Sequence, residues 1–501
     1  MSGFSRRSFL KGALAGGAIA GASAVVPRIA GASGLTTATL SNGRTYKILE
    51  IFLDGGADFW AHAYQVPTWV GNATQYNPGL STISTGSPND WSPLFTGVSD
   101  PTLCPPTPLH RTFFAFAPNG DRVYWGPGVT PLVPHAGRAR MVILRHSFPF
   151  HEGAGPLALT GNALGRAGAF SLGAAVNRTR APGEAPVSFV IAVGEGHGTN
   201  TLSSATAIGA HGTENAPVLV AMGNTALAAQ LARDVPPAGS TVARSDGDAL
   251  RRHYNNRYRS MLYHAGSRTR SRAYDAYEGA LGTLQQHQGV QARINGVSFA
   301  VPPTTNAAQN ATVGAIEAAA GLLANGARHV LVADAGWDTH TGSYYSTFEG
   351  YAAYLTKRTY QVAYGIHKVI ASGAIDLDDT LVFIHSEFGR HQSSPNSNGV
   401  VGNGTEHNPE GYPVLLLGGP ITTRGIAGIL TGPANPFGIA VGDGVYGVTA
   451  VRAAVSLAAG IDPWQADMYS QSEDWFGLYL SQFTTLSAGN VPVLEQGIFG
   501  L

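Results

Sequence analysis

The sequence predicts an α/β fold with a mostly parallel central sheet, helices on both faces and long loop insertions. Short apolar runs bounded by turn residues alternate along the chain with segments of helical spacing. That alternation is typical of a parallel sheet covered on both sides. The 65 glycines and 30 prolines indicate many turns and long loops, while a hydrophobic fraction of 44% is normal for a folded domain.

The composition of the 501 residues excludes several classes of protein. A formal net charge of +0 gives no electrostatic footprint for nucleic acid or for an anionic membrane surface. Within Arg251–Tyr274 there are seven arginines and no acid, which we interpret as a solvated or paired helix face, with a nucleic-acid arm as the alternative. The single cysteine, Cys104, excludes an intramolecular disulfide and a cysteine-rich metal site.

The N-terminus predicts export. Residues 5–11 (SRRSFLK) match a twin-arginine signal, and an apolar stretch and the small-residue cleavage site Ala30-Gly31-Ala32 follow in order. The alternative is a short amphipathic helix with two surface arginines. No later run reaches the roughly 18 apolar residues of a membrane span. We therefore expect residues 1–32 to be a twin-arginine signal peptide. Residues 33–501 would form a single domain, located in the periplasm or outside the cell and delivered by the twin-arginine export machinery.

The strands of the sheet are predicted from short, apolar runs that end at turn residues. These runs are 45–53, 140–144, 187–193, 217–222, 328–333, 380–384 and 412–417. Helical spacing or small-residue composition predicts helices at 151–160, 247–290, 311–325, 351–372 and within 445–485. Residues 61–135 are rich in turn residues and predict an irregular excursion with short strands.

Metal-competent or acid–base side chains follow four of these strands. They are Asp54 and Asp58; His146, His151 and Glu152; Asp338 and His340; and Glu387 with Arg390 and, beyond a loop, His407. Ligands of α/β folds lie beyond the carboxyl ends of the strands, so we expect these groups to share one site. Carboxylates with imidazoles favour a divalent metal, zinc or manganese. Each residue taken alone also fits a turn acid or a hydrogen-bonded loop histidine.

Other catalytic motifs are missing from the sequence. It contains no Walker A loop and no GxSxG nucleophile elbow. His151-Glu152 opens like HExxH but lacks the second histidine, and the glycine-rich run 194–198 (GEGHG) lacks dinucleotide-binding spacing, so we interpret it as a loop. These absences leave the strand-end cluster as the candidate site.

Three motifs carry a resemblance to a known family. GWDTH at 336–340, SEFGR at 386–390 and GTEH at 404–407 resemble the exported bacterial proteins of the domain-of-unknown-function 1501 (DUF1501) family. That family is placed in the alkaline phosphatase-like superfamily with phosphatases, sulfatases and phosphoglycerate mutases. The resemblance covers most of the chain in order, with 61–135 and 195–310 matched only loosely. It implies an alkaline phosphatase-like fold.

The resemblance also implies roles for the metal ligands. Asp54, with Asp58 as the competing candidate, corresponds to the superfamily's first metal-binding aspartate. Asp338 and His340 resemble its middle ligand pair, at a shorter spacing. Glu387 lies where these enzymes place an acid at a strand end, and His407 resembles their last histidine ligand.

Two positions depart from the pattern of active relatives. Phe388 stands where a histidine ligand is usual, and His151 stands at the position of the nucleophile. His151 is therefore a candidate ligand, general base or nucleophile. Arg390 is expected to stabilise an anionic substrate, because guanidinium matches phosphate and sulfate oxygens bidentately.

The predicted function is that of an exported metal-dependent hydrolase-like protein acting on a small phosphate or sulfate ester. The alternative is a non-catalytic exported binding or structural protein that retains the phosphatase-like fold. A serine hydrolase using Ser386 or Ser147 is a third option. Geometry discriminates between the first two, because donor atoms converging within about 5 Å of one point would preserve a metal site.

Overall fold

The computed structural model describes most of the predicted sheet and its helices. The described residues are 38–58, 113–162, 170–181, 184–194, 196–198, 200–208, 215–221, 290, 293–294, 297, 307–340, 348–392, 405–430, 440–441, 446–463 and 491–501. They all fall within the compact unit Leu35–Leu501. The predicted signal peptide, the arginine-rich segment and most of the predicted helix at 247–290 lie outside them. None of the helices in the described ranges is long and apolar enough to cross a membrane.

The central sheet has eight strands in the order β13-β5-β12-β9-β1-β8-β6-β7. Their bounds are β1 Lys47–Leu53, β5 Ala139–Leu144, β6 Ser188–Val193, β7 Val218–Ala221, β8 His329–Asp334, β9 Thr380–Ser386, β12 Tyr412–Gly418 and β13 Gly425–Ala427. Every neighbouring pair is parallel except the two that β12 makes with β5 and β9. The mostly parallel sheet is therefore confirmed, with all seven predicted strands in it.

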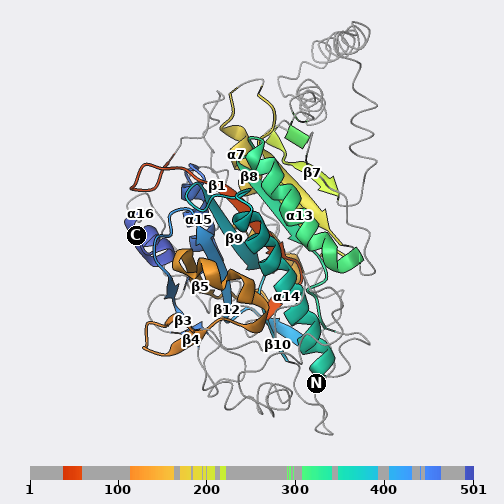
Figure 1. Cartoon of the computed structure of the whole chain (residues 1–501), viewed down its shortest axis with the longest axis vertical. Coiled ribbons are helices and arrows are strands. Elements are labelled where there is room, and N and C mark those ends of the chain that lie inside the picture. The colour runs from red at the N-terminus through yellow and green to blue at the C-terminus, as the bar shows by residue number, and fades with distance from the viewer. Residues whose placement is uncertain are drawn as a thin grey trace, which may run out of the picture. The chain divides into compact units, whose positions relative to one another are not determined.

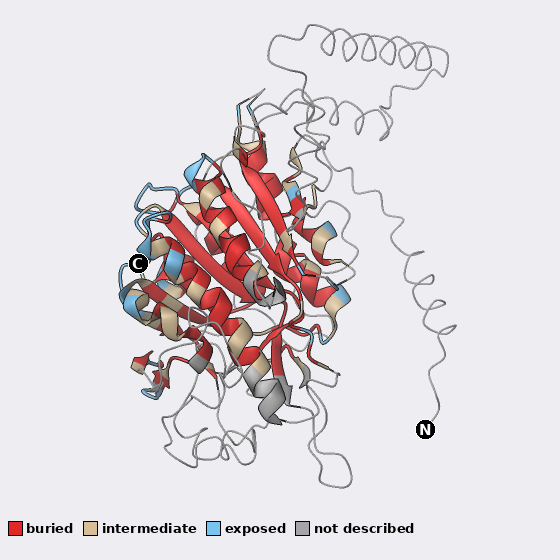
Figure 2. Ribbon diagram, turned by 45° about the vertical axis from the view of Figure 1, so that its right-hand side comes forward, coloured by how far each residue is buried: buried red, intermediate tan, exposed pale blue. Residues whose placement is uncertain are grey.

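Helices cover both faces of the sheet (Figure 1, Figure 2). One core lies between the sheet and α13 (Ala307–Ala324), α14 (Phe348–Ala371) and the 3-10 helix η2 (Pro127–Arg138). The other lies between the sheet and α6 (His151–Thr160), α7 (Leu172–Arg178) and α15 (Val448–Ala458). Alternate residues of β1 face the two cores, with Leu49 and Ile51 on one side and Ile48 and Phe52 on the other.

The remaining elements are short. They are β2 Ala57–Asp58, β3 Phe113–Phe116, β4 Arg122–Tyr124, α8 Thr201–Ala205, β10 Gly389–Gln392, β11 Thr405–Asn408, β14 Ile429–Leu430, β15 Ala440–Val441, α16 Val491–Leu494 and the π-helix η6 Glu495–Phe499. The predicted excursion at 61–135 contains the β3–β4 hairpin and the start of η2 within its described part.

The reversed direction of β12 is what assembles the candidate site. Since β12 runs antiparallel to β9, the segment before β12 lies at the same edge of the sheet as the end of β9. That segment includes β11, which pairs with β10, and β10 in turn pairs with β2 after β1. The pairing register puts Asp58, Arg390 and His407 in one row across this small sheet.

A charged network that the sequence analysis did not predict lies inside the sheet. Glu50 of β1 accepts hydrogen bonds from His329 Nε2 at 2.9 Å, from His385 Nε2 at 2.8 Å and from the guanidinium of Arg452. Burial opposes its charge, but Arg452 and the two histidines hold the pKa of the carboxyl well below its usual range. Arg452 also donates to the carbonyl of Leu159 at 2.8 Å, which ties the end of α6 to the sheet.

Candidate metal centre

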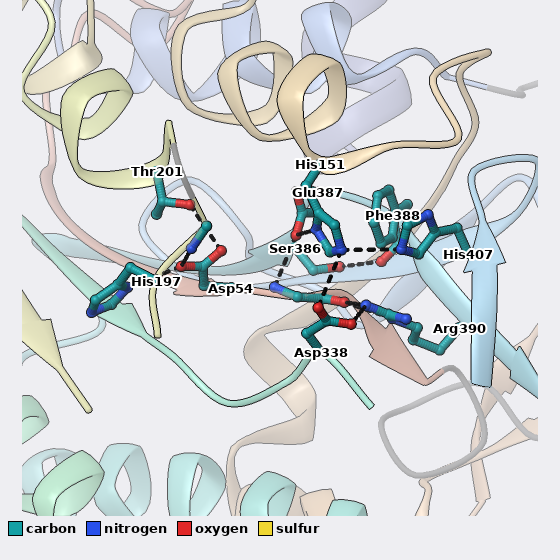
Figure 3. Close-up of polar contacts among 12 residues, drawn as sticks. Asp54, His151, His197, Thr201, Asp338, Ser386, Glu387, Phe388, Arg390 and His407 are labelled. Atoms are coloured by element: carbon teal, nitrogen blue, oxygen red, sulfur yellow. Dashed lines mark hydrogen bonds and ion pairs between the residues drawn. The ribbon is translucent and has the colours of Figure 1, made fainter. Parts of the chain in front are cut away.

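Four side chains bring their donor atoms to one place at the carboxyl edge of the sheet. They are His151, Asp338, His340 and His407, whose donor atoms all lie within 4.8 Å of one another. His407 Nε2 lies 2.6 Å from His340 Nε2 and 3.1 Å from His151 Nε2. Asp338 oxygens lie 3.5 Å from the Nε2 atoms of His151 and His340. Figure 3 shows His151, Asp338 and His407 facing one another.

The four come from three different places at this edge of the sheet. His151 is the first residue of α6, which follows β5, and Asp338 and His340 lie in the loop after β8. His407 lies on β11, opposite Arg390 of β10. Three segments that are far apart in the chain are therefore brought together by the order of the strands.

Hydrogen bonds at the far ends of two imidazoles determine which nitrogen faces the centre. His151 Nδ1 lies 2.7 Å from Glu387 Oε1, and His407 Nδ1 lies 2.5 Å from the carbonyl oxygen of Pro149. Since both partners are acceptors, each Nδ1 carries the proton and each Nε2 presents a lone pair in the neutral ring. This is the arrangement of metal-ligating histidines, which donate their other nitrogen to a carboxylate or carbonyl.

The four donors fit a divalent ion of the zinc type. Three imidazoles and one carboxylate are ligands that zinc accepts, and a tetrahedral ion with bonds of about 2.0–2.2 Å needs ligand atoms about 3.3–3.5 Å apart. The separations given above run from 2.6 to 3.5 Å, and all four donor atoms lie within 4.8 Å, so the set brackets this spacing, with His340 and His407 closer together than a shared ion would hold them. Asp338, whose side chain is 49% exposed, leaves one side of the centre open to solvent.

Without a metal the same groups perturb one another's protonation. Burial lowers the pKa of His151, but hydrogen bonds to Asp338 and Glu387 outweigh it and raise the pKa to about 9. Burial and the charge of Arg390 lower the pKa of His407 to about 3. Burial opposes ionisation of Asp338, yet His151 and Arg390 hold its pKa far below the usual range. A proton on His151 beside Asp338 is therefore favoured, and a positive charge on His407 is opposed.

Glu387, predicted as a ligand, lies behind His151 and outside the four-residue cluster. Its Oε1 accepts from His151 Nδ1 and from the backbone N–H of Gly55 at 2.9 Å. Its Oε2 faces Gly155 of α6, where an added Cβ would lie 3.3 Å away. The side chain is 1% exposed, and burial raises its pKa although His151 opposes the shift.

Arg390, predicted to contact the substrate, is fully buried. Its Nε donates to the carbonyl oxygen of Gly55 at 2.6 Å, and its guanidinium donates to Asp338 Oδ1 at 2.6 Å. Its guanidinium thus links the backbone of Gly55 to Asp338. Contact with a substrate stays a prediction.

Asp54 belongs to a second carboxylate–histidine pair. Its carboxylate accepts from His197 Nδ1 at 2.9 Å, from the N–H of Gly198 at 3.0 Å and from Thr201 Oγ1 at 2.8 Å. Figure 3 shows His197 on the far side of Asp54 from His151. Asp58 lies in β2 and pairs through its backbone with Arg390; its side chain lies outside the described residues.

His197 was missed because its loop, GEGHG, has no recognised motif. A usable signal was present, since the loop directly follows β6 and so lies at the same edge of the sheet as the other clusters.

His146, by contrast, supports the surrounding loops. Its Nε2 lies 2.7 Å from the carbonyl of Glu387, and its Nδ1 accepts from the N–H of Phe148 at 3.1 Å. Glu152 is exposed.

Phe388 packs its ring against the centre. Its centroid lies 4.1 Å from that of His407 and 5.1 Å from that of His151, and the residue is fully buried. Figure 3 shows the ring beside His407. The aromatic side chain therefore forms one wall of the centre.

The fold and the centre define an α/β protein with a histidine-rich candidate metal site. The chain belongs to the family described as "Protein of unknown function (DUF1501)", whose model matches residues 151–481, about two thirds of its length. That match confirms the family suggested by the three motifs. No curated protein matches the chain.

Three solved structures show weak similarity. Each is 10% identical in sequence. Ps i-CgsB in complex with k-i-k-neocarrahexaose has a TM-score of 0.34, with 84% of this chain and 73% of that chain covered. The C-terminal periplasmic domain of EcEptC from Escherichia coli, in complex with Zn, has a TM-score of 0.33 with 88% and 89% covered. The PsFucS1 sulfatase from Pseudoalteromonas sp. has a TM-score of 0.34 with 84% and 68% covered. Similarity at this level does not establish an activity.

Proposed function

We propose that this protein is an exported, metal-dependent hydrolase with an alkaline phosphatase-like fold, acting on a small phosphate or sulfate ester. The observation that carries the proposal is the convergence of His151, Asp338, His340 and His407. Four of the predicted site residues thus meet the geometric criterion for a metal site, since their donor atoms lie within 4.8 Å. Zinc or manganese suits this ligand set.

The charges of the ligands favour an anionic substrate. Three neutral imidazoles and the carboxylate of Asp338 leave a divalent ion with one net positive charge. When bound, such an ion supplies Lewis-acid polarisation of an ester oxygen and lowers the pKa of water. The exposed side of Asp338 gives the ester a route to the centre. His151, whose Nδ1–H is held by Glu387, is then a metal ligand. If its Nε2 left the metal, His151 would be the candidate nucleophile or general base.

Phe388 favours a second candidate, a non-catalytic exported binding or structural protein that retains the fold. Its ring packs beside His151 and His407, at a position where the resemblance implies a histidine ligand in active relatives. A protein of this kind would still bind metal, with the metal supporting structure or the binding of an anion. The two candidates therefore differ in turnover and not in metal content.

The experiment uses the exported form of the full chain, whose N-terminus also tests the predicted signal peptide. The chain is stripped with a chelator, reloaded with zinc or manganese, and assayed with aryl phosphate, phosphodiester and aryl sulfate substrates. The proposal expects turnover that disappears in the stripped protein and in His151→Ala, and returns on reloading the wild type only. Metal binding without turnover on any of these esters would favour the non-catalytic candidate.

A further inference from the structure

The number of metal ions follows from how the carboxylates are used. The six predicted ligands are enough for two ions, but only Asp338, His340 and His407 of those six lie in the cluster, joined by His151. The carboxylates of Asp54 and Glu387 are the remaining described candidates for a second ion. Both are buried, at 4% and 1% exposure, so a free oxygen on either would be costly.

Neither carboxylate turns a free oxygen towards the cluster. Asp54 accepts three hydrogen bonds, from His197, Gly198 and Thr201, which use most of the roughly four lone-pair directions of a carboxylate. Glu387 Oε1 accepts two hydrogen bonds, and its Oε2 faces α6. A second ion would have to break these bonds inside the protein.

Orienting partners are seen for His151, His407 and Asp338. Glu387 holds His151, the carbonyl of Pro149 holds His407, and Arg390 holds Oδ1 of Asp338 at 2.6 Å. Oδ2 of Asp338 is the oxygen that faces His151. Such outer partners fix the tautomer of a histidine and the rotation of a carboxylate, which lowers the entropy lost when a metal binds.

One residue, Gly55, connects the two charged partners through its backbone. The N–H of Gly55 donates to Glu387, and the carbonyl oxygen of Gly55 accepts from Arg390. Gly55 has φ +122°, and an added Cβ would lie within 2.7 Å of the Cα of Asp338. Only glycine therefore lets this turn carry Glu387 and Arg390 while Asp338 lies directly against it.

We propose that the centre takes one divalent ion, held by His151, Asp338, His340 and His407, and that Glu387 and Arg390 are positioning residues anchored on the backbone N–H and carbonyl of Gly55. The proposal rests on the metal binding that the proposed function requires. It adds the number of ions, and it assigns Glu387 to the support of His151 and not to the metal.

The test measures metal content and metal affinity in the full chain. The probe is zinc alone, titrated against a competing chelator, with X-ray absorption to count imidazole ligands. The wild type is expected to hold one zinc per chain with three imidazoles. In Glu387→Gln, which keeps the size of the side chain, we expect one zinc with affinity lowered about 10-fold to 100-fold. In Glu387→Asp, whose carboxylate is too short to reach His151, we expect a loss in the same direction.

The matched control is His197→Gln, which disrupts the other carboxylate–histidine pair. It should keep one zinc per chain at an affinity within about threefold of the wild type, since outer-partner effects act on the ligand they touch. Two zinc ions per wild-type chain, or an unchanged affinity in both Glu387 variants, would overturn the proposal while leaving metal-dependent hydrolysis intact. One zinc without turnover would instead count against the proposed hydrolase only. Absence of zinc from the wild type would overturn both.

Discussion

Two carboxylate–histidine pairs lie at the same edge of the sheet and differ in what the histidine meets. In each pair an imidazole Nδ1 lies within hydrogen-bond distance of a buried carboxylate, at 2.7 Å for His151 and Glu387 and 2.9 Å for His197 and Asp54. The Nε2 of His151 faces three other donor side chains. The Nε2 of His197 is buried and meets no hydrogen-bond partner among the described residues. We therefore interpret the converging neighbours, and not the carboxylate–histidine pair itself, as the feature that distinguishes the candidate metal site.

The largest effect should be on metal affinity, from removing a histidine of the cluster that His151 of the His151–Glu387 pair faces. His340→Ala deletes an imidazole of the cluster, and we expect zinc affinity to fall by more than the roughly 100-fold cost of losing an outer partner. His197→Ala should leave zinc affinity unchanged. Chelator competition on both variants checks this, and equal losses in the two would abolish the distinction between the pairs.

The next largest effect should be on stability, from a substitution at Gly55, which lies against Asp338 and donates to Glu387. Gly55→Ala places a Cβ against the backbone of Trp337 and Asp338 at a positive φ. We expect a loss of about 2–5 kcal/mol in the free energy of unfolding from strain and overlap. Urea denaturation of the metal-free protein measures it. Gly43→Ala, also at positive φ but with nothing within 4 Å, is the control for strain alone; equal losses in both would mean that the close approach at Gly55 contributes nothing.

Acid should weaken the loop that supports the first pair. Burial lowers the pKa of His146 to about 4 against an ordinary value near 6.5, so the folded state favours the neutral ring. Its contribution is complete above about pH 6.5 and is lost as the pH falls towards 4, by up to about 3 kcal/mol. Denaturation of the metal-free protein at pH 7.5 and 4.5 should show a smaller difference in His146→Gln than in the wild type. An identical pH dependence in the two proteins would contradict this assignment.

The smallest effect should come from Thr201, which supports Asp54 in the Asp54–His197 pair. Thr201→Val removes the hydroxyl that donates to Asp54 Oδ1 at 2.8 Å. Loss of a hydrogen bond to a buried carboxylate should cost about 1–3 kcal/mol, with no change in zinc content. Thermal unfolding and metal analysis of one sample give both numbers. A change in zinc content would show that Asp54 belongs to the metal centre after all.

The sheet was predictable because buried strands leave short apolar runs that local sequence reveals. Its polar edge was predictable for a related reason: the carboxyl ends of parallel strands meet, so residues after several strands gather there. Orientation was not predictable in the same way. Asp54 and Asp338 are the same residue type, each after a parallel strand, and a contact 147 positions away, from Thr201, helps to hold Asp54 outside the cluster.

The partners of buried charged residues could not be predicted from local sequence patterns either. Glu50 lies within an apolar run, and its partners His329 and Arg452 are 279 and 402 positions away. Arg390 is predicted to stabilise a substrate because guanidinium suits anions, and its bonds to the backbone of Gly55 and the carboxylate of Asp338 could not be read from the sequence. Long-range partners of this kind leave no periodic signal in the chain.

The metal content of the purified protein tests the central claim most directly. Elemental analysis of the full chain, after dialysis against a metal-free buffer, should find one zinc or manganese ion per chain in the wild type and in His197→Gln. It should find none in His407→Ala, which removes the imidazole that lies between His151 and His340. A metal-free wild type, or an undiminished metal content in His407→Ala, would contradict the account.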